Sequence, residues 1–220
     1  MLAYPAPESF ALSSLGFMWM YKKIDEVDDI LIDLIYENSK PNLRIKPDML
    51  GFSFSFDLDF SKIFKIIENC QLELKSSLRK EDDPIIFAGG PVVTANPLPY
   101  KEFFDFFIIG DGEELNLKSV QICKENKHKT KSEILKILSE IEGIYVPSVN
   151  PEKVTKITKK LDECIYTPII SDKSFFKNTF IIEAERGCAN CCAFCLASYL
   201  NLPIRFIEYD KIISTIVSEI

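Results

Sequence analysis

The sequence predicts an α/β fold built on a doubly wound parallel sheet, and three short apolar runs are the main reason. Residues 48–54, 84–88 and 105–109 are rich in aromatic or β-branched residues, and the second and third run lead into glycines. Such runs, each leading towards a helical pattern, are typical of strands buried on both faces of a parallel sheet. The chain has 220 residues, of which 47% are hydrophobic, so it can bury a core in one large or two small domains.

A helical pattern follows the first run. After residues 55–57, apolar side chains recur every three or four positions, which is the period of one helix face; they are Phe60, Ile63, Phe64, Ile66 and Ile67. We therefore expect a strand followed by a helix over residues 48–67.

The second and third runs end in glycine-rich turns. Gly89 and Gly90 follow the second run, and Gly110 and Gly112 follow the third. Ligands of doubly wound sheets bind off the carboxyl ends of the strands, and glycine lets a ligand approach the backbone closely. These four glycines are candidate ligand-binding residues, with tight turns as the alternative interpretation. The neighbouring acids are expected to complement the dipole of the next helix; they are Asp111, Glu113 and Glu114.

A helix and a short strand close this first region. Apolar residues at helical spacing fill positions 132–141, with Ser132 as the expected N-cap and Gly143 as the stop. Residues 144–147 then predict a short closing strand.

Three spaced cysteines are the strongest functional signal in the chain. Cys188, Cys192 and Cys195 have the spacing Cys-x3-Cys-x2-Cys, and they follow an expected strand at 179–184. Thiolates are the usual ligands of iron–sulfur clusters, and their spacing can be read from a sequence. Three thiolates on one loop can hold three irons of a [4Fe-4S] cluster and leave the fourth iron open to a substrate or cofactor.

A zinc site and a purely structural group of cysteines are the alternatives to a cluster at this loop. Cys191 makes the loop read also as two adjoining Cys-x2-Cys pairs, a pattern that binds zinc. The two pairs of a zinc site are normally about 15–20 residues apart, so four cysteines within eight positions fit one tetrahedral ion badly. An inert, packed group of cysteines stays open as well, since free cysteine is often buried. We expect Cys191 not to be a ligand.

The stretch from Arg186 to Cys195 resembles the signature of the radical S-adenosylmethionine (SAM) superfamily, in its spaced cysteines and in the aromatic Phe194 before the last of them. The resemblance implies that the open iron binds the amino and carboxylate groups of SAM. It also implies reductive cleavage of SAM to a 5′-deoxyadenosyl radical, with the backbone around Phe194 against the adenine. A flavodoxin or ferredoxin is the implied electron donor, and the catalytic residues towards the substrate stay unknown.

Residues 1–146 resemble the cobalamin-binding-type Rossmann domain of one radical SAM subfamily. The matching segments, in order, are residues 4–17, Gly51-Phe52-Ser53, 87–91 and 109–113. The sequence departs from that domain in one respect: His128 is its one histidine and does not lie in an Asp-x-His-x2-Gly motif. Either the domain binds cobalamin without a protein ligand, or it is a degenerate Rossmann module that packs on the catalytic domain.

These observations divide the chain into three expected parts. A cobalamin-binding-type Rossmann domain covers residues 1–146, and a linker with an edge strand near 154–157 covers 147–178. The N-terminal fragment of a radical SAM domain covers 179–220, as the first βα unit of a partial β/α barrel.

Only the beginning of such a barrel is expected in this chain. A βα unit takes about 30 residues, so six units need on the order of 180. We expect the remainder in a missing C-terminal barrel portion or in a second polypeptide, and the fragment alone to be inactive. Within the fragment, residues 210–220 predict an amphipathic helix, and Arg205 is expected at the surface.

Net charge and cysteine usage limit the partners and the cellular compartment that we expect. The formal net charge of −7 does not indicate a nucleic-acid surface. The basic stretch 124–131 is expected to be a solvated loop, with a phosphate-contacting loop as the alternative. No signal segment or membrane-spanning run is visible, so we expect no membrane contact. The remaining cysteines are scattered singly, which favours the reducing cytoplasm; they are Cys70, Cys123 and Cys164.

Overall fold

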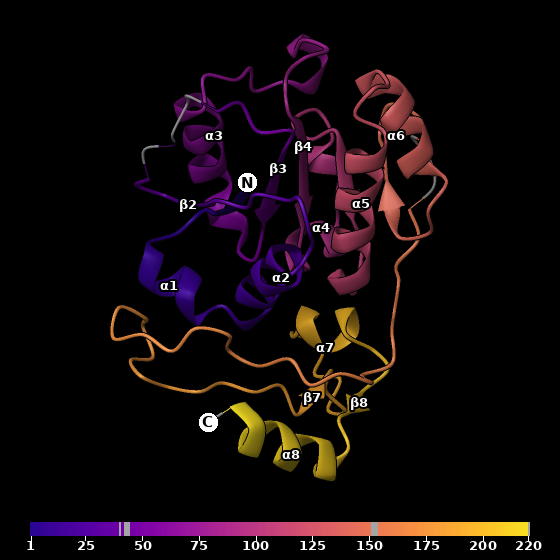
Figure 1. The fold of residues 1–220 in the computed structure, drawn as a ribbon. Helices are drawn as coiled ribbons and strands as arrows, with labels where there is room; N and C mark the ends of the chain where they lie inside the picture. Colours follow the sequence, from indigo (N-terminus) through magenta and orange to yellow (C-terminus); the bar gives the residue numbers. More distant parts are fainter. Residues whose placement is uncertain (40, 42–44, 151–153, 220) are drawn as a thin grey trace.

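The computed structural model has a central sheet of six strands in the order β2-β1-β3-β4-β5-β6, within the residues that it describes: 1–39, 41, 45–150 and 154–219 (Figure 1). The first five strands are parallel, and β6 is antiparallel to β5. The three apolar runs form β3, β4 and β5, which confirms the predicted α/β fold with its mostly parallel sheet. The strands are β1 (Leu2–Tyr4), β2 (Leu34–Tyr36), β3 (Met49–Ser53), β4 (Ile85–Gly89), β5 (Phe106–Ile108) and β6 (Ile144–Tyr145).

Helices cover both faces of the sheet (Figure 1). One face packs against α3 (Phe60–Asn69), and the other against α2 (Leu15–Asp25), α5 (Glu113–Glu125) and α6 (Lys131–Ser139). The connections also contain short helices: α1 (Glu8–Ser13), α4 (Pro91–Ala95), and the 3₁₀ helices Asp57–Asp59, Ser76–Leu78 and Leu98–Tyr100.

Alternation along the strands explains why the apolar runs are continuous. Leu50 and Phe52 of β3 lie in the core under α3, whereas Met49 lies in the core under α5 and α6. Phe107 and Ile108 of β5 divide between the same two cores, and both are fully buried. A strand covered on both faces needs apolar residues at every position, so these runs show no polar alternation.

The predicted helix at 132–141 is confirmed, but its N-cap is not Ser132. Thr130 caps α6: its side chain accepts from the Glu133 N–H, and the Glu133 carboxylate accepts from the Thr130 N–H at 2.8 Å. This reciprocal arrangement is a capping box, and the Thr130-x-x-Glu133 pattern encodes it in the sequence.

The basic stretch at 124–131 is only partly the solvated loop that was expected. Its exposed part is the turn after α5, where His128 lies. At its end, the Lys131 ammonium lies 3.0 Å from the carboxylate of Asp105, which also binds the buried Arg79 guanidinium at 3.0 Å. Burial lowers the pKa of Arg79, and the attraction of Asp105 opposes this shift.

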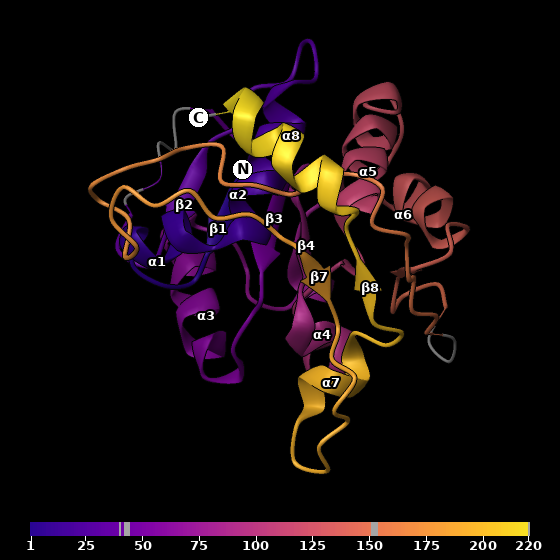
Figure 2. The ribbon, with the colours of Figure 1, turned by 90° about the horizontal axis from the view of Figure 1, so that it is seen from below.

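The C-terminal part of the chain lies across the carboxyl ends of the parallel strands (Figures 1 and 2). It contains a two-stranded antiparallel sheet of β7 (Glu185–Arg186) and β8 (Arg205–Phe206), and two helices, α7 (Leu196–Leu200) and α8 (Tyr209–Glu219). The predicted helix at 210–220 is therefore present as α8, and Ile220 lies outside the described residues. No helix in the described part of the chain has the length and apolar content that crossing a membrane requires.

The strand expected at 179–184 is wrong in position. Ile182 forms a single antiparallel bridge with Tyr166, and the regular strand begins only at Glu185. The edge strand expected near 154–157 reduces to one residue, Ile157, which forms a parallel bridge with Gly110. Residues 151–153 of the expected linker lie outside the described residues.

The core under α3 provides a stability prediction. Phe107→Ala removes a fully buried ring and should lower the free energy of unfolding by about 3–5 kcal/mol, because the cavity that is left cannot fully collapse. Denaturant unfolding, followed by the fluorescence of the buried Trp19, measures this loss. Phe56→Ala is the matched control: that ring is 57% exposed, so its removal should change stability by about 0.5 kcal/mol or less. Equal losses in the two variants would contradict the described core.

Candidate functional site

A cleft of about 300 Å³ opens at the carboxyl ends of β3, β4 and β5. All four glycines selected from the sequence line it, namely Gly89, Gly90, Gly110 and Gly112. The cleft lies where doubly wound sheets bind their ligands, and the parallel sheet brings these distant turns together because its strands end at one edge.

Backbone geometry explains two of the four glycines. Gly90 has φ +114°, and a Cβ there would lie 2.7 Å from the Phe54 carbonyl oxygen. Gly110 has φ +100°, and a Cβ there would collide with the backbone of Ile157. Both positions favour glycine whatever the cleft binds. Gly112 has an ordinary φ of −94°.

The walls of the cleft are apolar or neutral. Among the described residues that line it, Glu113 is the one with a charged side chain, and its carboxylate is bound by Arg186 at 2.6 Å. The other polar groups are Ser14, Ser53, Ser55 and Asn116. With no cationic side chain among these residues, an anionic group here would have to be bound by the backbone N–H groups at the starts of α4 and α5.

The cysteine loop, residues 187–204, connects β7 to β8 beside this cleft. The Cys188, Cys192 and Cys195 side chains are half-buried, Cys191 is exposed, and within the described residues none is in a disulfide. Cys195 is the N-cap of α7, and hydrogen bonding by the Ser198 hydroxyl and N–H lowers the pKa of its thiol. Helix α7 packs against α4, which follows β4 at the cleft.

The structure places the three predicted ligands on one loop without bringing their sulfurs together. In the described part of the chain, no three His, Cys, Asp or Glu side chains are grouped closely enough to hold a metal ion. The donors still fit an iron–sulfur cluster in kind, because three thiols on a partly exposed loop are what such a cluster requires. Phe194, the residue expected near adenine, has a side chain that is 92% exposed.

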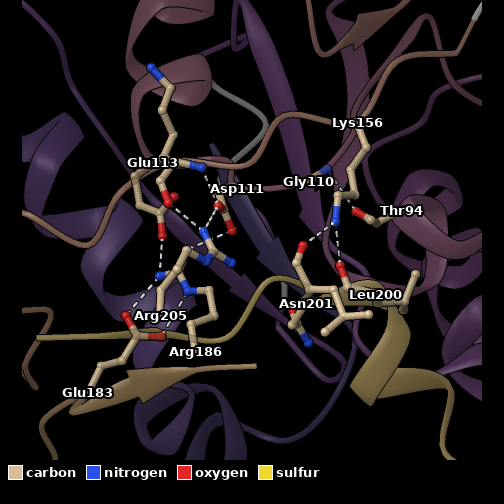
Figure 3. Close-up of polar contacts among 12 residues, drawn as sticks. Thr94, Gly110, Asp111, Glu113, Lys156, Glu183, Arg186, Leu200, Asn201 and Arg205 are labelled. Carbon is tan, nitrogen blue, oxygen red and sulfur yellow. Dashed lines mark hydrogen bonds and ion pairs between the residues drawn. The ribbon is translucent and has the colours of Figure 1, made fainter. Parts of the chain in front are cut away.

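Asp111 is the functional residue that its sequence position did not reveal. It was expected to complement a helix dipole, as Glu113 and Glu114 do in the first turn of α5. Instead, its carboxylate lies between two guanidinium groups (Figure 3). Arg186 Nη1 lies 2.8 Å from Asp111 Oδ1, and Arg205 Nη1 binds the other oxygen, Oδ2.

Arg205 is therefore not the surface residue that was expected. Its side chain is 12% exposed and, besides Asp111, binds the Lys159 carbonyl. Arg186 also has additional partners, the carboxylates of Glu183 at 2.8 Å and of Glu113. The contacts link the sheet edge to both ends of the cysteine loop.

The electrostatics of Asp111 favour its ionised form. Burial acts to raise the pKa of this carboxyl, but hydrogen bonds from Arg205, the Lys159 N–H and Arg186 outweigh it and hold the pKa below its usual value. A lowered folded-state pKa stabilises the fold above the unfolded value of about 4, and the contribution is lost as pH falls through the folded value. The contact between sheet and loop is therefore fully formed at neutral pH.

Two comparisons with known proteins are informative. The family model described as "Radical SAM proteins, N-terminal" matches residues 32–147. An uncharacterized protein of Methanocaldococcus jannaschii is 32% identical over 201 residues, which is 89% of this chain and 36% of that protein. The chain thus spans about a third of the length of this relative. No solved structure matches the chain.

Thiol reactivity tests the described burial of the cysteines. Burial raises the pKa of Cys123 to about 12, so at pH 8 only about one in ten thousand of these thiols is ionised. Iodoacetamide should therefore modify the exposed Cys191 rapidly in the native, metal-free chain and leave Cys123 unmodified until pH approaches 12 or the chain unfolds. Mass spectrometry of the digested protein distinguishes the sites, with denatured chain as the control. Equal native rates at the two positions would contradict the structure.

Proposed function

The chain belongs to the radical SAM protein family, and from this membership we propose that its Cys188, Cys192 and Cys195 hold a [4Fe-4S] cluster that binds SAM. The single observation that carries the proposal is the Cys-x3-Cys-x2-Cys spacing, on a loop next to a ligand-sized cleft. Fe–S clusters are held by thiolates in this kind of spacing. The neighbouring cleft supports the proposal because a reactive centre needs a place for its substrate.

Each residue has a proposed task. The thiolates of Cys188, Cys192 and Cys195 would hold the cluster and leave one iron open to SAM, and the backbone around Phe194 would lie against the adenine. When bound, the cluster supplies the electron for reductive cleavage of SAM to methionine and a 5′-deoxyadenosyl radical. The chain itself has to position the cysteine loop and shield the centre from water.

We propose that residues 1–146 form a Rossmann domain on which the cysteine-bearing fragment, residues 179–220, packs directly. The contacts of Asp111 with Arg186 and Arg205 support this packing. Corrinoid binding is less well supported. The cleft, at about 300 Å³, is at the small end for ligand sites, and the ring of Phe87 occupies the space beside Gly51.

The activity of a complete enzyme would need further parts. We propose that a flavodoxin or ferredoxin supplies the electron and that the rest of a barrel comes from additional chain or a second polypeptide. The coverage of about a third of the archaeal relative is consistent with this division.

Anaerobic reconstitution tests the cluster. The wild-type chain should bind about four irons and about four sulfides, and its reduced electron paramagnetic resonance spectrum should change when SAM is added. Cys188→Ala, Cys192→Ala and Cys195→Ala should each lose most of the iron and the SAM-dependent change, because each removes one of three ligands.

Cys191→Ala is the matched control, since it removes an exposed thiol from the same loop that is not expected to be a ligand. It should retain the wild-type iron content and spectrum. Stoichiometric zinc in the purified chain would contradict the cluster and favour the zinc-binding alternative. No iron after reconstitution would also contradict the cluster and would leave a Rossmann-type binding module with an inactive fragment.

A further inference from the structure

The cysteine loop is closed at its base by two arginines. β7 and β8 are antiparallel, and their register places Arg186 directly opposite Arg205. Residues 187–204, with four of the seven cysteines, thus form one excursion between the two. The two ends of the loop pass close to each other, because a Cβ on Gly187 would lie 2.7 Å from the Asn201 carbonyl oxygen.

This closure places like charges side by side. Cationic residues directly opposite one another destabilise a pair of strands, and a buried position makes the repulsion stronger because water screens it less. The Arg186 and Arg205 side chains are 15% and 12% exposed. An anion between the guanidinium groups would offset this repulsion and stabilise the pairing of the two strands.

Asp111 supplies that anion. Each of its two carboxylate oxygens binds one arginine (Figure 3), and among the described residues it is the acid that contacts both. Its own position is fixed, because its N–H donates to the Ile157 carbonyl at 3.0 Å and its carboxylate accepts from the Lys159 N–H at 2.8 Å. The point at which the loop closes is therefore set by the sheet.

The two arginines depend on Asp111 to different degrees. Arg186 has two other carboxylates, those of Glu183 and Glu113, whereas Arg205 has Asp111 as its one acidic partner among the described residues. Loss of the Asp111 charge should leave Arg186 paired and Arg205 repelled. The end of the loop at β8 should then separate from the sheet first.

We propose that Asp111 is the positioning residue of the cysteine loop: by binding both guanidinium groups, it fixes the loop beside the glycine-lined cleft. Gly110 and Gly112, which flank Asp111 in the sequence, both line that cleft. The turn that carries the positioning residue therefore also forms part of the cleft wall. The role of this loop position in SAM chemistry rests on the proposed cluster. The contacts that fix the loop position do not depend on the cluster.

Hydrogen–deuterium exchange of the metal-free chain tests the positioning directly. Asp111→Asn keeps the size of the side chain and removes its charge, and it should raise exchange at residues 187–204 by about tenfold, a typical size for a coupled contact. Exchange in β3 and β4 should not change. Glu114→Gln is the matched control, because it removes a neighbouring, 71% exposed carboxylate that binds only Lys159 among the described residues; it should leave both regions unchanged.

A double variant separates positioning from general destabilisation. Arg205→Met removes one of the two opposed charges, so Asp111→Asn/Arg205→Met should show slower loop exchange than Asp111→Asn alone. A simple loss of stability would make the double variant exchange faster than either single variant, and that result would overturn the proposal. Unchanged loop exchange in Asp111→Asn would overturn it as well. If Asp111→Asn does not fold, recovery of folding in the double variant supports the proposal, and failure to recover contradicts it.

The reconstituted chain provides the second readout. Asp111→Asn should bind the wild-type amount of iron, because it retains the cysteines, but should need about tenfold more SAM to reach half of the spectral change. Wild-type SAM dependence with faster loop exchange would overturn the role of the position in SAM binding. A wild-type chain without iron would instead contradict the proposed function and leave the exchange result valid.

Discussion

The backbone contact between Ile157 and residues 109–111, just after β5, brings the C-terminal part of the chain to the sheet. Ile157 donates to Ile109 and accepts from Asp111, both at 3.0 Å, and the positive φ of Gly110 lets the two backbones approach this closely. Residues 154–184 contain no helix or regular strand, and the rest of their path follows contacts with α1 and α2, such as those of Ser174 with Ser13 and of Tyr166 with Trp19. The contacts of Asp111 with the two arginines, and hence the place of the cysteine loop, depend on this junction.

The charged group at the junction fixes geometry more than it adds stability. Burying Asp111, Arg186 and Arg205 requires removing several charges from water, and the attraction between them largely offsets that cost without exceeding it by much. An apolar group of the same size could stabilise the fold equally well. Such an apolar group could not direct two strand ends to one point. Apolar contacts lack the directionality of a carboxylate whose two oxygens each bind one guanidinium group. This argues that the group is present for position.

The sequence patterns were reliable where structure is local. Apolar runs predict β3, β4 and β5, because strands buried on both faces need such runs. The Thr130-x-x-Glu133 pattern encodes the capping box of α6, although the apolar periodicity alone places the N-cap at Ser132. The strand expected at 179–184 failed because an extended apolar run pairs only where a neighbour is available, and Tyr166 offers a single bridge. The link from Asp111 to Arg186 and Arg205 spans 75 and 94 residues, so only the sheet topology could reveal it.

The contacts at the two ends of the cysteine loop also limit how its three candidate ligands can approach one another. Within the described residues the three ligand candidates are not grouped, so binding a cluster requires the loop to change its conformation. Arg186 and Arg205 hold the two ends, and the Lys156 ammonium binds the Leu200 carbonyl at 2.8 Å just after the last cysteine. A rearrangement can then be confined to the segment from Cys188 to Cys195. With both ends held by these contacts, the entropy of ordering the loop would be lost over a few residues, and metal binding need not disturb the sheet.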